Sequence, residues 1–125
     1  MNIIIKTNQA PKPIGPYSQA VIAGNTLYIS GQIALEPLSG NLIIDNIANE
    51  TKQVMENLKA ILIHAEMSFS NMVKTTIFLS NMDDFATVNE IYGTYFTGNY
   101  PARETVAVKT LPKNVHVEIS AIAVK

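Results

Sequence analysis

Hydrophobic residues recur at helical spacing in two stretches of the chain, residues 46–66 and 82–97. Positions three and four apart lie on one side of a helix, so each stretch predicts an amphipathic helix with one buried side. Asn81 or Ser80 is expected to cap the second helix, and Gly98 is expected to end it. The first stripe consists of Val54, Leu58, Ile61, Leu62 and Ala65, and the second of Phe85, Val88, Ile91, Tyr92, Tyr95 and Phe96.

Six other runs are rich in apolar and β-branched residues and predict strands. The pair Gly24–Asn25 suits a two-residue turn between the second and third runs, and residues 111–114 connect the last two. Two helices within a set of strands that begins and ends with a hairpin predict an α+β domain, in which one mixed sheet carries both helices on one face. The six runs are residues 2–6, 19–23, 26–30, 72–79, 104–110 and 115–124.

The last run, residues 115–124, is apolar at both alternating sets of positions. This pattern predicts a central strand, or a strand whose second face meets another subunit. A symmetric hairpin around residues 111–114 would place Ala107 opposite Glu118, about 13 Å along the strands from Arg103. A slip of one residue moves Glu118 to the other face. The side chains that the symmetric hairpin brings to one face are those of Arg103, Thr105, Glu118 and Ser120.

The composition narrows the function classes. The 125 residues suit one domain, residues 1–125, and the formal net charge of -1 argues against wholesale binding of nucleic-acid phosphates. The chain has no cysteine, which excludes disulfides, thiolate metal sites and a cysteine nucleophile. No uninterrupted apolar run exceeds four residues, and the start of the chain lacks the apolar core of a secretory signal, so a cytoplasmic protein without membrane contact is expected.

Arg103 is the single arginine beside eight lysines. Arginine differs from lysine by its planar fork, which binds a carboxylate through two parallel hydrogen bonds. Arg103 is therefore a candidate for binding a substrate carboxylate. The structural alternative is an ion pair within the chain, with Glu104 or Glu118 as the partner.

Glu118 lies between Val117 and Ile119 in the apolar last run. A carboxyl group in such surroundings must be paired or have a raised pKa, and either state suits a general acid–base group. The alternative is a glutamate at a strand edge that faces water. His64 and His116 have no further ligand at metal-binding spacing, so no metal is expected.

Six segments occur in the order and spacing of one protein family, and together they cover essentially the whole chain. With these segments the sequence resembles the RidA/YjgF family of reactive-intermediate (enamine/imine) deaminases. The segments are Ile14–Gln19, Ile29–Ile33, Val73–Leu79, Asp84–Asn89, Pro101–Arg103 and Val117–Ile119.

The resemblance implies a chorismate-mutase-like α+β fold and a homotrimer with ligand clefts between subunits. It also implies hydrolysis of 2-iminobutanoate and 2-iminopropanoate to 2-keto acids and ammonia, without a cofactor. In this family pattern Arg103 binds the substrate carboxylate and Glu118 positions and activates water. The remaining substrate-binding residues are Tyr17, Ser30, Gly31, Asn89 and, through its backbone, Thr105.

Three residues depart from the family pattern and bear on substrate preference. Thr105 replaces a common cysteine, Ser120 replaces a common second glutamate, and Glu104 adds a negative charge beside Arg103. Two other functions remain open: an endoribonuclease or translation inhibitor, and a non-catalytic trimer that binds keto acids. Two isolated histidines and one arginine argue against RNA cleavage, which needs paired acid–base groups and a cationic phosphate site.

Overall fold

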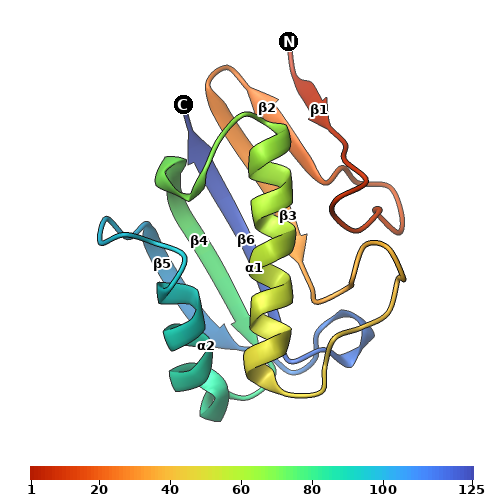
Figure 1. Ribbon diagram of the computed structural model, residues 1–125, viewed down its shortest axis with the longest axis vertical. Coiled ribbons are helices and arrows are strands. Elements are labelled where there is room, and N and C mark those ends of the chain that lie inside the picture. Colours follow the sequence, from red (N-terminus) through yellow and green to blue (C-terminus); the bar gives the residue numbers. More distant parts are fainter.

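Six strands form one mixed sheet, and two helices lie across one of its faces (Figure 1). The computed structural model describes all residues from 1 to 125. The strand order is β1-β2-β3-β6-β4-β5, and every neighbouring pair is antiparallel except β4 and β5. The predicted α+β class with both helices on one face is confirmed. The elements are β1 (Ile3–Ile5), β2 (Ala20–Ala23), β3 (Thr26–Gln32), α1 (Ile47–His64), β4 (Met72–Leu79), α2 (Phe85–Gly93), β5 (Ala102–Ala107) and β6 (Val117–Val124).

The core lies between α1 and the central strands. The α1 stripe predicted from spacing is buried, and Val54, Leu58 and Ile61 are fully inaccessible to solvent. They belong to the same buried cluster as Ile77 of β4 and Ile119 of β6. Burial of such side chains stabilises the fold by about 2 kcal/mol each.

The predicted hairpin between the last two strands is wrong. β6 lies between β3 and β4, whereas β5 pairs with β4 in parallel at the edge of the sheet. Two features explain this arrangement. The helix between β4 and β5 makes a crossover that brings the second strand back parallel to the first, and the apolar β6 is best buried with a neighbour on each side. Residues 108–116 therefore carry the chain past β4.

The second helix ends earlier than its stripe predicts. A short 3-10 turn, Met82–Asp84, precedes α2, and the helix stops at Gly93 rather than before Gly98. The Thr94 hydroxyl donates to the carbonyl of Ile91 at 2.6 Å, and the following amides form the tighter bonds of a turn. This turn lets Tyr95 and Phe96 pack against the Phe69 ring.

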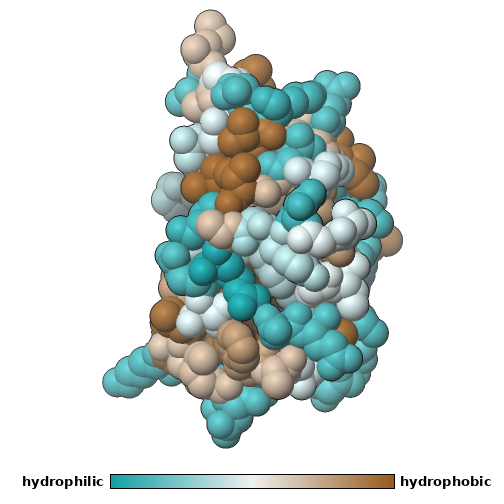
Figure 2. Space-filling model, turned by 90° about the vertical axis from the view of Figure 1, so that its left-hand side faces the viewer, coloured by the Kyte–Doolittle hydropathy of each residue, from teal (hydrophilic) through white to brown (hydrophobic).

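The sheet face opposite the helices is uncovered and partly apolar. Tyr28 of β3 pairs with Ile122 of β6, and Phe78 of β4 pairs with Val106 of β5. Tyr28 is 50% exposed and Val106 45% exposed. Figure 2 shows the side of the molecule on which β5 and α2 lie, where hydrophobic residues gather in patches beside hydrophilic ones.

Neither helix combines the length and apolar character that crossing a membrane requires.

Candidate functional site

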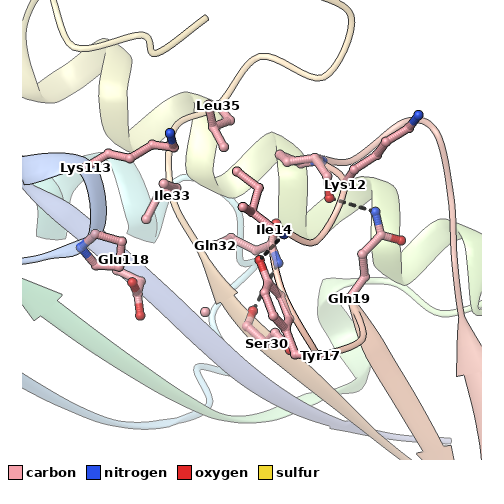
Figure 3. Close-up of a pocket in the computed structure, with 13 residues that line it drawn as sticks. Lys12, Ile14, Tyr17, Gln19, Ser30, Gln32, Ile33, Leu35, Lys113 and Glu118 are labelled. Atoms are coloured by element: carbon pink, nitrogen blue, oxygen red, sulfur yellow. Dashed lines mark hydrogen bonds between the residues drawn. The ribbon is translucent and has the colours of Figure 1, made fainter. Parts of the chain in front are cut away.

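Glu118 faces a pocket of about 560 Å³, the Glu118 pocket, which lies between the loop before β2, the end of β3 and the turn before β6. The Glu118 carboxyl group and the Tyr17 ring lie on its walls, with Ser30 near the ring (Figure 3). Lys12 and Lys113 also line the pocket. The structure thus brings together Tyr17, Ser30, Gly31 and Glu118, four of the residues that the sequence singled out.

Gln19 holds the loop that forms one wall of the Glu118 pocket. Its side chain is buried, and its amide donates to the carbonyls of Thr7 at 3.0 Å and Pro11 at 2.8 Å. Its amide oxygen accepts the Thr7 N–H at 2.7 Å. Three prolines leave this loop short of backbone donors, so a side chain supplies the hydrogen bonds. Gln19 belongs to the first family segment, yet sequence reasoning gave it no role.

An irregularity in β3 turns Ser30 and Gly31 toward the pocket. The register between β3 and β6 shifts between Ile29 and Gln32, as in a β-bulge. The Ser30 hydroxyl donates to the Ser18 carbonyl at 2.6 Å, which fixes the bulged residue. Sequence patterns do not reveal such a bulge, although Gly31 directly after a strand is consistent with one.

Gly31 leaves room for the Glu118 carboxyl group. A Cβ atom added at Gly31 would collide with Oε2 of Glu118 and lie 2.8 Å from its Cδ. The backbone of Gly31 is not in the left-handed region, so an alanine would fit the chain itself. The constraint on residue 31 therefore comes from the position of the carboxyl group.

Gly31→Ala is expected to displace the Glu118 carboxyl group and to lower turnover of the proposed imine substrate by about a hundredfold, the cost of misplacing a reacting group by an ångström. Steady-state kinetics of the single variant and of the double variant with Glu118→Gln provide the measurement. If the effect passes through Glu118, the double variant is no slower than Glu118→Gln alone. Additive losses would show that Gly31 acts in another way.

Glu118 is half-buried and carries no compensating partner. Lys74 forms an ion pair with Glu104, and the His116 ring contacts Glu50; neither interaction involves Glu118. Burial raises the pKa of the Glu118 carboxyl group above its usual value. The interpretation of Glu118 as an ion-pair partner of Arg103 is wrong, because neither residue forms an ion pair within the chain. The interpretation of Glu118 as a strand-edge residue is also wrong, because β6 lies between β3 and β4.

Arg103 lies on β5 and does not line the Glu118 pocket. Its side chain contacts one side of α2. Its guanidinium carbon lies 5.6 Å from the centre of the Phe85 ring and 5.3 Å from that of Tyr92. Its Nη1 donates to the side-chain oxygen of Asn89 at 2.7 Å. Residues 85, 89 and 92 fall on one side of a helix, so α2 presents two rings and an amide to one guanidinium.

Tyr92 is held in place by a hydrogen bond to Thr75 of β4. Its hydroxyl is 2.8 Å from the Thr75 hydroxyl in the buried interior, and burial raises its pKa. Arg103 therefore rests on a rigid ring, and its remaining N–H groups face a pocket of about 660 Å³, the Arg103 pocket. The sequence placed Phe85 and Tyr92 on the apolar helix stripe and did not reveal their contact with Arg103.

Arg103 and Glu118 lie on opposite faces of the sheet. Arg103 pairs with Thr75, which is buried beneath the helices, whereas Glu118 pairs with Phe78 on the uncovered face. The predicted shared face of Arg103 and Glu118 is wrong, because it assumed the hairpin that the structure replaces by a parallel β4–β5 pair. Within one chain the candidate residues thus form two separate half-sites.

Thr105 and Glu104 occupy the two faces of β5. Thr105 pairs with Ile77 and lies on the Arg103 side, where its hydroxyl is buried without a hydrogen-bond partner. Glu104 points to the other face and forms an ion pair with Lys74 at 3.1 Å. The alternative interpretation of Arg103 as an ion-pair partner of Glu104 is therefore wrong, because Glu104 pairs with Lys74.

Comparison with known proteins defines the family. The model of the family described as endoribonuclease L-PSP matches residues 7–125. The chain therefore belongs to this family, the RidA/YjgF family that its motifs resemble. The 2-iminobutanoate/2-iminopropanoate deaminase of Rattus norvegicus is 52% identical over 122 residues, which cover 98% of this chain and 89% of the rat protein.

Solved structures of the family have the same fold. A Rid family protein of Yersinia pestis superimposes with a TM-score of 0.97 at 44% identity, covering all of both chains. E. coli TdcF, solved with bound serine, superimposes with a TM-score of 0.95 at 40% identity and covers 98% of both chains. These similarities establish the chorismate-mutase-like fold predicted from the motifs.

No group of three or more histidine, aspartate and glutamate side chains is placed to hold a metal ion.

Proposed function

We propose that the protein hydrolyses reactive 2-imino acids, 2-iminobutanoate and 2-iminopropanoate, to 2-keto acids and ammonia without a cofactor. The observation that carries the proposal is the Arg103 fork, which lies beside the Phe85 and Tyr92 rings, donates to Asn89 and lines the Arg103 pocket. Such a fork matches a carboxylate. The deaminase names of relatives near 50% identity and the serine bound to TdcF support a small amino-acid-like substrate.

The chemistry follows from the two groups. Arg103 binds the substrate carboxylate and thereby fixes the neighbouring C=N carbon. Glu118 accepts a proton from water as the oxygen attacks that carbon, and it returns this proton to the imine nitrogen, which gives a carbinolamine. Glu118 then takes the proton of the new hydroxyl group and passes it to the amine nitrogen, so that the C–N bond breaks and ammonia leaves as the C=O bond forms. The sum is imine plus water to keto acid plus ammonia.

The carboxyl group of Glu118 is suited to both steps because burial raises its pKa above the usual value and so favours its return to the protonated form. An acid–base group works best when its pKa lies near the working pH. Tyr17, Ser30 and Gly31 line the space in front of this group and are assigned to substrate contact. Asn89 positions Arg103, and Thr105 is assigned a backbone contact with the substrate on the same side of β5.

We further propose that the site is completed between copies of the chain in a homotrimer. Arg103 and Glu118 occupy opposite faces of the sheet, so one chain cannot bring both to one small substrate. The uncovered face carries Tyr28, Val106 and Ile122, and the edge strand β5 has an unpaired side. Both features are expected at an interface between subunits. A closed ring of three would place the Glu118 pocket of each subunit against the Arg103 pocket of the next.

Mixing two inactive variants tests this assembly. Arg103→Lys and Glu118→Gln are each expected to be nearly inactive, whereas trimers assembled from an equal mixture should regain about a quarter of wild-type activity, because a quarter of the clefts then receive both native groups. Refolding or co-expression followed by the imine assay gives the measurement, and light scattering gives the mass. No recovery from verified mixed trimers, or a fully active monomer, would contradict a site shared between subunits.

The endoribonuclease alternative is tested on the same preparation. Cleavage of RNA needs paired acid–base groups, and the Glu118 pocket contains no histidine and no second carboxyl group, since His116 is held by Glu50 and His64 lies elsewhere on α1. Lys12 and Lys113 supply the pocket's only positive charges. We expect keto-acid release from imine and no cleavage of single-stranded RNA above the blank. The opposite result would favour the nuclease.

A further inference from the structure

Glu50 is the only fully buried charged residue of the chain. It lies in the first turn of α1, and its exposed fraction is 0%. Its Oε2 accepts the backbone N–H groups of His116 at 2.7 Å and Val117 at 3.2 Å. Its Oε1 lies 2.7 Å from Nδ1 of the His116 ring. These three contacts compensate a carboxylate that would otherwise be costly to bury.

The contacts join the start of α1 to the entry of β6. The His116 carbonyl accepts the N–H of Ser80, so its peptide is fixed on both sides. His116 lies just before β6 begins at Val117, outside the regular strand. A side chain 66 residues away in sequence therefore supplies the hydrogen bonds at this point.

The positions of the Glu118 carboxyl group and of the pocket wall beside it both depend on the backbone of residues 116 and 117. Glu118 is the residue after Val117, and its carboxyl group lies directly over Gly31. On the other side, Pro112 and Lys113 line the pocket from the turn before His116, and Lys113 is held in the left-handed backbone region. A shift of residues 116–117 would move the carboxyl group and this wall together.

We propose that Glu50 is a positioning residue for the imine hydrolysis: its carboxylate oxygens fix the backbone of His116 and Val117 and so hold Glu118 over Gly31. This inference rests on the proposed function, and it assigns to Glu50 no contact with substrate. Its effect comes from accepting two hydrogen bonds rather than from charge. Arg103 is on another strand and is held by α2, so binding of the substrate carboxylate does not depend on Glu50.

Three variants separate positioning from mere stability. Glu50→Gln keeps an oxygen that accepts both N–H groups, and we expect nearly wild-type kcat. Glu50→Leu has a similar volume but no acceptor, and we expect kcat to fall by about tenfold or more with KM little changed. Glu50→Asp keeps the charge but is one methylene shorter and cannot reach both N–H groups. It should show the same loss of kcat, and it serves in place of the leucine variant if that variant does not fold.

A purely structural role would lower the melting temperature of the variants but leave kcat per folded molecule unchanged. Unchanged kcat in folded Glu50→Leu or Glu50→Asp would overturn the proposal. A second readout does not need activity: titration of the Glu118 carboxyl carbon by NMR. Its pKa should move toward the ordinary value in either variant, because the carboxyl group leaves its half-buried place, and an unmoved pKa would also overturn the proposal. Absence of imine turnover in the wild type would instead refute the proposed function.

Discussion

Glu118→Gln is expected to lower imine turnover by about a hundredfold or more, the typical loss of a general acid–base group. Glutamine preserves the shape of the side chain and removes proton transfer. Binding of a 2-keto acid should survive, because the carboxylate of the ligand is bound by Arg103. Turnover and the affinity for a 2-keto acid, measured on one preparation, provide the comparison.

The change in stability caused by Glu118→Gln can also be predicted. Burial raises the folded-state pKa of Glu118 above the usual value of 4.5, so its stabilising contribution is complete below that value and is lost as the pH rises through the raised pKa. Glutamine has no such loss, so the melting temperature of Glu118→Gln should equal or exceed that of the wild type at neutral pH. Full turnover with a lowered melting temperature would make Glu118 a structural tether.

Arg103→Lys is expected to lower kcat/KM by about a hundredfold while the fold and the proposed trimer persist. Lysine keeps the positive charge but cannot donate two parallel hydrogen bonds, and it lacks the planar guanidinium that lies beside the Phe85 and Tyr92 rings. Kinetics with 2-iminobutanoate, and titration with a 2-keto acid, measure the loss of carboxylate binding.

Glu104→Gln is the matched control for Arg103→Lys. Glu104 is adjacent in sequence, but it points to the other sheet face and pairs with Lys74. We expect its KM to stay near that of the wild type, with the oligomeric mass checked in parallel. Unchanged turnover in Arg103→Lys would refute the assignment of Arg103 to carboxylate binding.

Spacing and motifs predicted most of the secondary structure. The two helices, the buried stripe of α1 and the six strands follow from local periodicity, which the structure confirms within a few residues at most ends. The central position of β6 was also predictable, because both of its faces are apolar. The family motifs named Tyr17, Ser30, Gly31 and Glu118 among the site residues, and the structure places these four around one pocket. Their roles in the reaction stay predictions.

The strand pairing could not be predicted from the same patterns. The length of residues 111–114 suits a hairpin, whereas in the structure residues 108–116 connect β5 to β6 past β4. The pairing follows from the crossover through α2 and from burial of the apolar β6 between two neighbours, which the length of the connection does not reveal. The parallel pairing of β5 with β4 places Arg103 on the sheet face that the helices cover, whereas Glu118 lies on the other face. The contacts of Gln19 and Glu50 were also missed, because they join segments distant in sequence through single side chains.

The most direct test of the proposed activity supplies 2-iminobutanoate continuously, from threonine and a threonine dehydratase, and follows release of 2-ketobutyrate and ammonia. Wild-type protein should accelerate release in proportion to its concentration, whereas Glu118→Gln in the same assembly state should leave it near the uncatalysed rate. If the folded wild-type protein binds a 2-keto acid but does not accelerate release, the deaminase proposal is contradicted, and the cleft belongs to a non-catalytic binding protein.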